Sequence, residues 1–169
     1  EVNNAKTLIA NQVEGILVSV SKETSDFQHL DDILLHGIPL VFFDRIAPGI
    51  PADQIIINDF EAAYQATKHL TELGRKRIAH FAGPLNLDIG IQRKEGYLKA
   101  MAEAGLPVLP GFCTETDSFE KAYHEIIRIN ETGLMPDAVF CHNDLTAIGT
   151  IKSLRKLKFR IPVDVAVVG

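Results

Sequence analysis

Polar and charged side chains follow several apolar stretches directly, where they could bind a small hydroxylated molecule. Asp44 and Arg45 follow the stretch 38–43, and Asn143 and Asp144 come soon after 138–141. A carboxylate accepts hydrogen bonds and a guanidinium donates them, so either pair could bind sugar hydroxyls. The same residues could also form a structural salt bridge or cap a helix. The residue types leave both interpretations open.

Arg93 and Phe119 are two further candidates. The pattern predicts a helix over 92–104, so Arg93 stands at its start, where a cation is electrostatically disfavoured. That position favours a functional reason for the arginine. Phe119 could be a core anchor or an aromatic platform for a sugar ring, and spacing alone favours the core. Asn143 opens another predicted helix, so it could cap that helix or contact a ligand.

Signatures of catalysis, nucleotide binding and metal binding are missing. The chain contains no G-x-G-x-x-G, no G-x-x-x-x-G-K-[ST] and no G-x-S-x-G motif. Its six histidines form no H-x-x-x-H or Cys/His cluster. Cys113 and Cys141 are far apart in apolar stretches, which predicts buried free thiols. We therefore expect no enzyme activity, no cofactor and no metal.

Strand-like and helix-like segments alternate along the chain, which predicts parallel sheets with helices on both faces. In such sheets, ligands bind beyond the carboxyl ends of the strands. Asn58 and Glu61 have capping-box spacing, so a new unit is expected to begin there. The expected strands are 13–20, 38–44, 54–57, 77–82, 112–115, 138–141 and 165–168, and the expected helices are 26–36, one from 58 to about 73, 92–104, one from 118, and 144–157.

The charge of the chain bears on its partners. The formal net charge is −5 and the isoelectric point about 5.7, which argues against direct binding to DNA or to anionic lipid. No apolar run is long enough to span a membrane, so no membrane association is expected.

Five segments of the sequence resemble the LacI/GalR family of bacterial transcription regulators, in the order and spacing of that family. They are GIPLVFFDR (37–45), HLTELGRKRIAHFAGP (69–84), RKEGYLKAMAEAGL (93–106), PDAVFCHNDLTAIG (136–149) and RIPVDVAVVG (160–169).

The resemblance implies an α/β fold of the type I periplasmic-binding-protein class, with two doubly wound parallel-sheet lobes and an effector in the cleft between them. Residues 1–58 would be a partial N-terminal lobe and 59–169 the C-terminal lobe, truncated at both ends. The family's helix-turn-helix head would be absent from this chain, and operator DNA would be bound only through that head. The implied protein is a cytoplasmic homodimer that couples a sugar-like effector to operator affinity.

The family's effector contacts match this sequence at Asp44, Arg45, Arg93, Phe119, Asn143 and Asp144. Leu87 and Ile89 depart from the family, because they are apolar at loop positions where relatives often carry polar contacts. Two other functions stay open. An extracytoplasmic sugar-binding protein of a transport system would share the fold, and an enzyme on a similar scaffold is disfavoured by the missing signatures.

Overall fold

The chain is described by a computed structural model that covers residues 1–169. It divides into two compact units, residues 1–57 and 58–169, which are described separately. The boundary falls one residue before the expected end of the first lobe. The assignment of these units to the two lobes of one effector-binding core stays a prediction.

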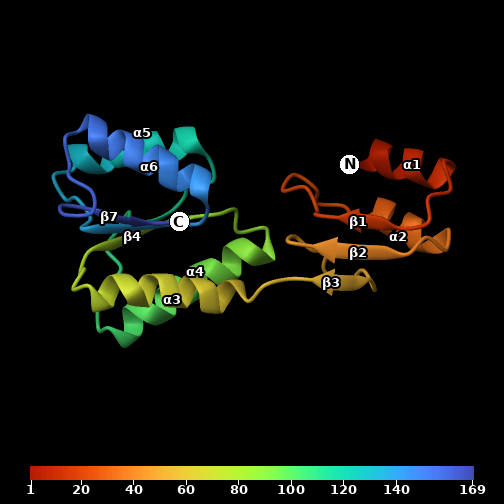
Figure 1. Cartoon of the computed structure of the whole chain (residues 1–169), viewed down its shortest axis with the longest axis horizontal. Helices are drawn as coiled ribbons and strands as arrows, with labels where there is room; N and C mark the ends of the chain where they lie inside the picture. The colour runs from red at the N-terminus through yellow and green to blue at the C-terminus, as the bar shows by residue number, and fades with distance from the viewer. The chain divides into compact units, whose positions relative to one another are not determined.

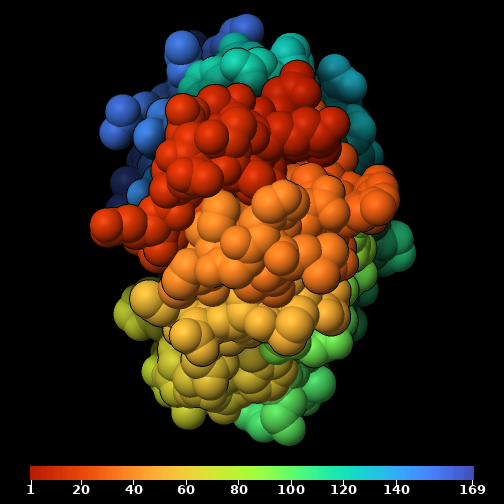
Figure 2. All heavy atoms as spheres, turned by 90° about the vertical axis from the view of Figure 1, so that its right-hand side faces the viewer, coloured from red at the N-terminus to blue at the C-terminus, as the bar shows by residue number.

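Unit 1 is a three-stranded parallel sheet with two helices (Figure 1). Its strands β1 (Ile16–Val18), β2 (Leu40–Phe43) and β3 (Asp53–Ile55) pair in the order β1-β2-β3. Helices α1 (Val2–Ala10) and α2 (Gln28–Leu35) contribute to one buried cluster with β2. In Figure 2 the atoms of α1 lie within the red part of the surface of unit 1.

The other face of the unit 1 sheet is apolar and exposed. Leu17, Phe43 and Ile55 are 72%, 45% and 68% exposed. The expectation that 13–20 is a strand buried on both faces is therefore wrong. The strand spans only Ile16–Val18, and its central residue Leu17 is exposed, whereas Ile16 and Val18 pack against the core cluster. An apolar run alone does not reveal which face is covered.

Unit 2 is a four-stranded parallel sheet in the order β5-β4-β6-β7, with helices on both faces (Figure 1). The strands are β4 (Ile78–Ala82), β5 (Cys113–Glu115), β6 (Ala138–Cys141) and β7 (Ala166–Val168). Helices α3 (Asp59–Glu72) and α4 (Asp88–Glu103) pack together, and so do α5 (Phe119–Glu131) and α6 (Asp144–Lys156). Two separate buried clusters, one on each face, hold this doubly wound arrangement together.

Side-chain caps fix the starts of three helices in unit 2. Asn58 accepts a hydrogen bond from the Glu61 amide at 2.9 Å, and Ser118 accepts one from the Lys121 amide at 3.2 Å. Both predicted starts are confirmed. Asn143 caps α6 in the same way. The helix predicted from 58 to about 73 ends at Glu72, and Leu73 is its C-terminal cap residue and 60% exposed.

Helix α4 begins at Asp88, four residues before the predicted start. Arg93 is therefore the sixth residue of the helix and not a residue of its first turn. Arg93 therefore lacks the unfavourable interaction with the helix dipole that we expected, because that effect is confined to the first turn. Cys141 is buried as predicted, whereas Cys113 is only half-buried; both are free thiols. None of the helices is long and apolar enough to cross a membrane.

Candidate functional site

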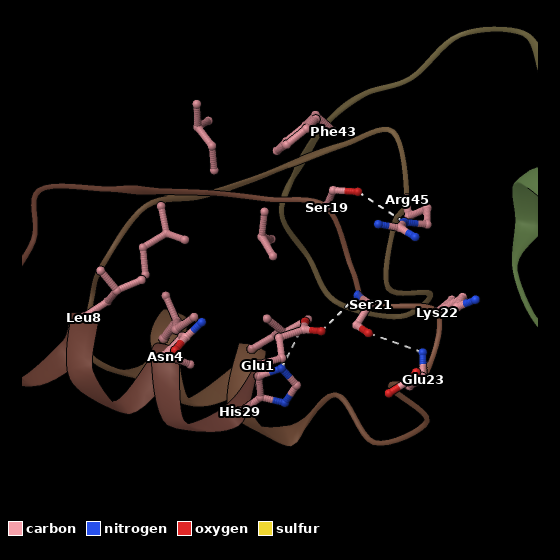
Figure 3. A pocket seen from close by; sticks show the side chains of 16 residues that line it. Glu1, Asn4, Leu8, Ser19, Ser21, Lys22, Glu23, His29, Phe43 and Arg45 are labelled. Atoms are coloured by element: carbon pink, nitrogen blue, oxygen red, sulfur yellow. Dashed lines mark hydrogen bonds and ion pairs between the residues drawn. The ribbon is translucent and has the colours of Figure 1, made fainter. Parts of the chain in front are cut away.

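Unit 1 holds a pocket of about 660 Å³ beside β1 (Figure 3). β1 is an edge strand, so its outer side has no neighbouring strand in this sheet. Apolar side chains line the part of the pocket along β1, and polar ones gather beyond the carboxyl end of that strand. The polar lining residues are Glu1, Asn4, Ser19, Ser21, Lys22, Glu23, His29 and Arg45.

Asp44 and Arg45 meet Ser19 at this end of the sheet. The Ser19 hydroxyl donates to Asp44 Oδ2 at 3.3 Å. Arg45 Nε donates to Ser19 Oγ at 3.2 Å (Figure 3). Asp44 has a φ of 61°, a left-handed conformation that aspartate tolerates better than most residues. Its side chain is 54% exposed and that of Arg45 is 32% exposed. Both can therefore contact a molecule bound beside them.

A carboxylate ties α1 to the loop after β1. Glu1 accepts a hydrogen bond from the Ser21 amide at 2.9 Å, and His29 Nε2 lies 3.3 Å away (Figure 3). It also accepts one from the Thr24 hydroxyl at 2.7 Å. These bonds outweigh the effect of partial burial, so the pKa of Glu1 is lowered. The network fixes the polar wall of the pocket.

Unit 2 holds a second pocket, of about 340 Å³, at the carboxyl end of β6. Its polar lining comes from Arg93 on α4, His142 and Asn143 after β6, and Asp144 in the first turn of α6. Its apolar floor is Ala62, Ala63, Ala66, Phe140 and Cys141, with Gly169 completing the lining. The structure thus brings three predicted residues together, namely Arg93, Asn143 and Asp144.

Arg93 is held by two partners. Its Nε–H donates to Asp59 Oδ1 at 2.8 Å, and its NH1 group donates to the carbonyl oxygen of His142. The side chain of Arg93 is 20% exposed and that of Asp59 is 10% exposed. Sequence reasoning missed Asp59, because it stands beside the capping Asn58 and its type is ordinary for the first turn of a helix.

His142 is a second residue absent from the predicted set, although it directly follows a predicted strand. Its backbone amide donates to the Phe81 carbonyl at 3.0 Å, which continues the pairing of β4 with β6. A Cβ atom at Gly83 would lie 2.7 Å from the His142 ring, so a larger residue there would displace this ring. Thr146 Oγ1 and Asn143 Nδ2 lie 3.3 and 3.0 Å from the two ring nitrogens.

Asn143 and Phe119 have structural partners. Asn143 Oδ1 accepts from the Thr146 amide at 2.9 Å, so its oxygen caps α6. The ring of Phe119 stacks on Tyr123 at 6.3 Å, with Lys152 Nζ 5.3 Å from its centroid. Phe119 is not among the residues that line the Arg93 pocket. Contact of either residue with an effector stays a prediction.

Comparison with known proteins identifies the family. A family described as periplasmic binding protein-like domain matches residues 67–169. The HTH-type transcriptional repressor PurR of Actinobacillus pleuropneumoniae is 35% identical over 168 residues, which cover 99% of this chain and 49% of that protein. The chain belongs to the periplasmic binding protein-like family, in its LacI/GalR branch. It spans about half the length of the curated relatives that it matches.

Solved structures share the fold of this chain. The transcriptional regulator CelR in complex with cellobiose matches with a TM-score of 0.85 at 29% identity, covering 99% of this chain and 51% of that one. A periplasmic solute-binding protein of an ABC transporter from Actinobacillus succinogenes, with bound D-allose, has a TM-score of 0.87 at 24% identity. It covers 99% of this chain and 62% of that one, and at this identity it shows the fold alone. The curated relatives are repressors and not enzymes, in agreement with the sequence.

Proposed function

We propose that this LacI/GalR-type chain is the effector-sensing domain of a cytoplasmic, DNA-binding transcriptional regulator. One observation carries the proposal: a polar pocket containing Arg93 lies at the carboxyl end of β6, in a chain whose relatives are named transcriptional repressors. The effector would be a small molecule, and we propose a sugar or a sugar derivative. Its preference for one conformation of the regulator would be transmitted as a change in operator affinity.

The chemistry of both sites supports a hydroxylated effector. The Arg93 guanidinium can donate to hydroxyl oxygens, and the exposed carboxylate of Asp144 can accept from hydroxyl groups. Asp44 and Arg45 offer the same combination of acceptor and donor in unit 1. We propose each of these four residues as a candidate effector contact within its own unit. DNA binding is assigned to residues outside this chain, because its net charge is −5.

An extracytoplasmic solute-binding protein is the second candidate. The likeness to the D-allose-bound transporter protein supports the shared fold, but its identity is too low to support a shared role. The repressor relatives share more of this sequence and favour regulation. Sequence-specific DNA binding by the full-length protein separates the two candidates, since a transport protein has no need of it.

Ligand-induced stabilisation of the full-length protein tests the effector role. The panel contains sugars such as cellobiose and D-allose, their phosphates where these exist, and nucleobases. A ligand at about 100 times its Kd stabilises the native state by about 3 kcal/mol, which raises the Tm by about 5–10 °C. We expect one chemical class to give this shift in a thermal unfolding assay. A panel without any shift would count against a small sugar-like effector.

We also propose that the regulator is a homodimer, and that α6 contributes to its interface. Leu145 and Ile148 stand three residues apart on this helix and are 63% and 53% exposed. Apolar side chains grouped on one helix face favour association with another protein surface.

Replacing Leu145 and Ile148 with glutamate is therefore expected to weaken dimerisation by about 10-fold or more, because two charges would be buried at the interface. Sedimentation velocity over a range of concentrations measures the change. Leu73→Glu is the matched control, since Leu73 is 60% exposed at the end of α3. Unchanged association of the α6 double variant would exclude this surface.

A further inference from the structure

We propose that the effector is uncharged at the atoms that contact Arg93, and that Asp59 imposes this preference by neutralising the Arg93 guanidinium. The inference rests on the proposed function, because it concerns the same pocket. It narrows the effector from sugars and their phosphates to uncharged compounds that carry hydroxyl or carbonyl oxygens.

The contact between Arg93 and Asp59 is close and largely shielded from water. Nε of Arg93 and Oδ1 of Asp59 are 2.8 Å apart, and the two side chains are 20% and 10% exposed. Solvent and salt screen such a pair less than a pair on the surface. An approaching anion would meet the field of a neutral pair in place of a free cation, so its attraction to Arg93 is largely cancelled.

The other charges around the pocket reinforce this effect. Arg93 and Asp144 are the charged residues in its lining. Counting Asp59 on Arg93, one cation and two carboxylates leave one net negative charge. Asp144 also stands in the first turn of α6, where an anion would otherwise gain from the helix dipole. Lys94 follows Arg93 in sequence but is not among the lining residues.

The same contacts orient Arg93 for an uncharged ligand. A guanidinium has five N–H donors, and the bonds to Asp59 and to the His142 carbonyl use two of them. These two bonds fix the plane of the guanidinium, so less side-chain entropy is lost when a ligand binds. The remaining donors can serve neutral oxygen acceptors. Asp59 is thus a positioning residue that also determines specificity.

Inorganic phosphate is the probe for this role of Asp59. We would titrate it calorimetrically, at pH 7.5, into the full-length wild type, Asp59→Asn and the double variant Asp59→Asn/Arg93→Ala. Removing one carboxylate charge next to Arg93 should tighten phosphate binding by about 10-fold or more. The double variant should lose this gain. Asp88→Asn is the matched control, because it makes the same charge change at an exposed residue in the first turn of α4.

Equal phosphate affinity of the wild type and a folded Asp59→Asn variant would overturn the proposal. A second comparison does not need Asp59→Asn, so it holds even where that variant does not fold. Each sugar of the panel that has a stable phosphate ester is compared with that ester, in the wild type and in Arg93→Ala. Stabilisation by the uncharged member that requires Arg93 supports the inference.

Stabilisation by the phosphate that requires Arg93 would overturn the inference and leave the effector role of the pocket intact. Ligand binding that is insensitive to Arg93→Ala would instead remove the pocket from the proposed function, and the inference with it. The two failures are therefore distinguishable.

Discussion

Effector binding is expected to weaken by about 100-fold or more when Arg93 is replaced with alanine, because hydrogen bonds from a charged donor contribute about 1.5–3 kcal/mol each. Arg93 lies in the unit 2 pocket with its orientation fixed by Asp59 and His142. Calorimetric titration of the compound that stabilises the wild type measures the loss. The effector affinity of Arg93→Lys is expected to lie between those of the wild type and Arg93→Ala, since lysine keeps the charge but not the planar array of donors.

The Arg93→Ala variant should still fold cooperatively, although it leaves the largely buried Asp59 carboxylate without its cationic partner. We expect the free energy of unfolding to fall by about 2–4 kcal/mol for that reason. Arg155→Ala is the control, because Arg155 is exposed on α6 and outside the pocket lining. An Arg93→Ala protein that unfolds cooperatively and binds the effector as tightly as the wild type would contradict the placement of the site.

The stability of unit 2 is expected to depend on pH through His80. This side chain is fully buried in β4, between the rings of Phe140 at 4.6 Å and Tyr97 at 5.0 Å. Burial, with a smaller contribution from nearby His142, Lys94 and Arg93, lowers its pKa from 6.5 to about 4. Its Nδ1 lies 3.1 Å from the Phe140 carbonyl oxygen, and its Nε2 has no hydrogen-bond partner. Protonation would leave an unpaired donor and a charge in the core.

The direction of the effect follows from proton binding in the two states. Between pH 6.5 and pH 4 the unfolded chain protonates His80 while the folded chain does not. The contribution of neutral, buried His80 to the free energy of unfolding is therefore complete above pH 6.5 and is lost as the pH falls towards 4. The loss attributable to His80 is about 2 kcal/mol between pH 7.5 and pH 5.

Urea unfolding of the wild type and of His80→Phe at both pH values isolates this contribution. The variant keeps an aromatic ring in the same space and removes the titrating group. Between pH 7.5 and pH 5 its free energy of unfolding should therefore fall by about 2 kcal/mol less than that of the wild type. Equal pH dependence of the two proteins would show that His80 titrates as an exposed histidine.

Local signals in the sequence predicted much of unit 2. Asn58 and Ser118 were predicted as helix starts because a capping side chain needs only the amide three residues ahead. The start of α4 was missed because Gly90 lies within the helix at a point where sequence alone suggests a loop. A Cβ atom there would lie 2.1 Å from the Pro84 carbonyl oxygen, so close packing explains this glycine.

The candidate site was predictable only in part. The rule that ligands bind beyond strand ends placed Asn143 and Asp144 near the unit 2 pocket. Arg93 was selected from an expected helix start that proved wrong, and family resemblance supported it independently. Asp59 could not be found in this way, because its ion pair with Arg93 spans 34 residues of sequence and depends on how α3 packs against α4. The exposed face of β1 was not predicted, because exposed Leu17 and its partly buried neighbours Ile16 and Val18 are all apolar.

The central claim is that effector binding to this domain changes the affinity of the whole regulator for DNA. The most direct test measures the Kd of the full-length protein for a DNA sequence that it selects from a random library, with and without the stabilising compound. We predict a change of about 5- to 150-fold, in either direction, that disappears in Arg93→Ala. A protein that selects no sequence, or whose DNA affinity is the same with and without the bound compound, would contradict the account.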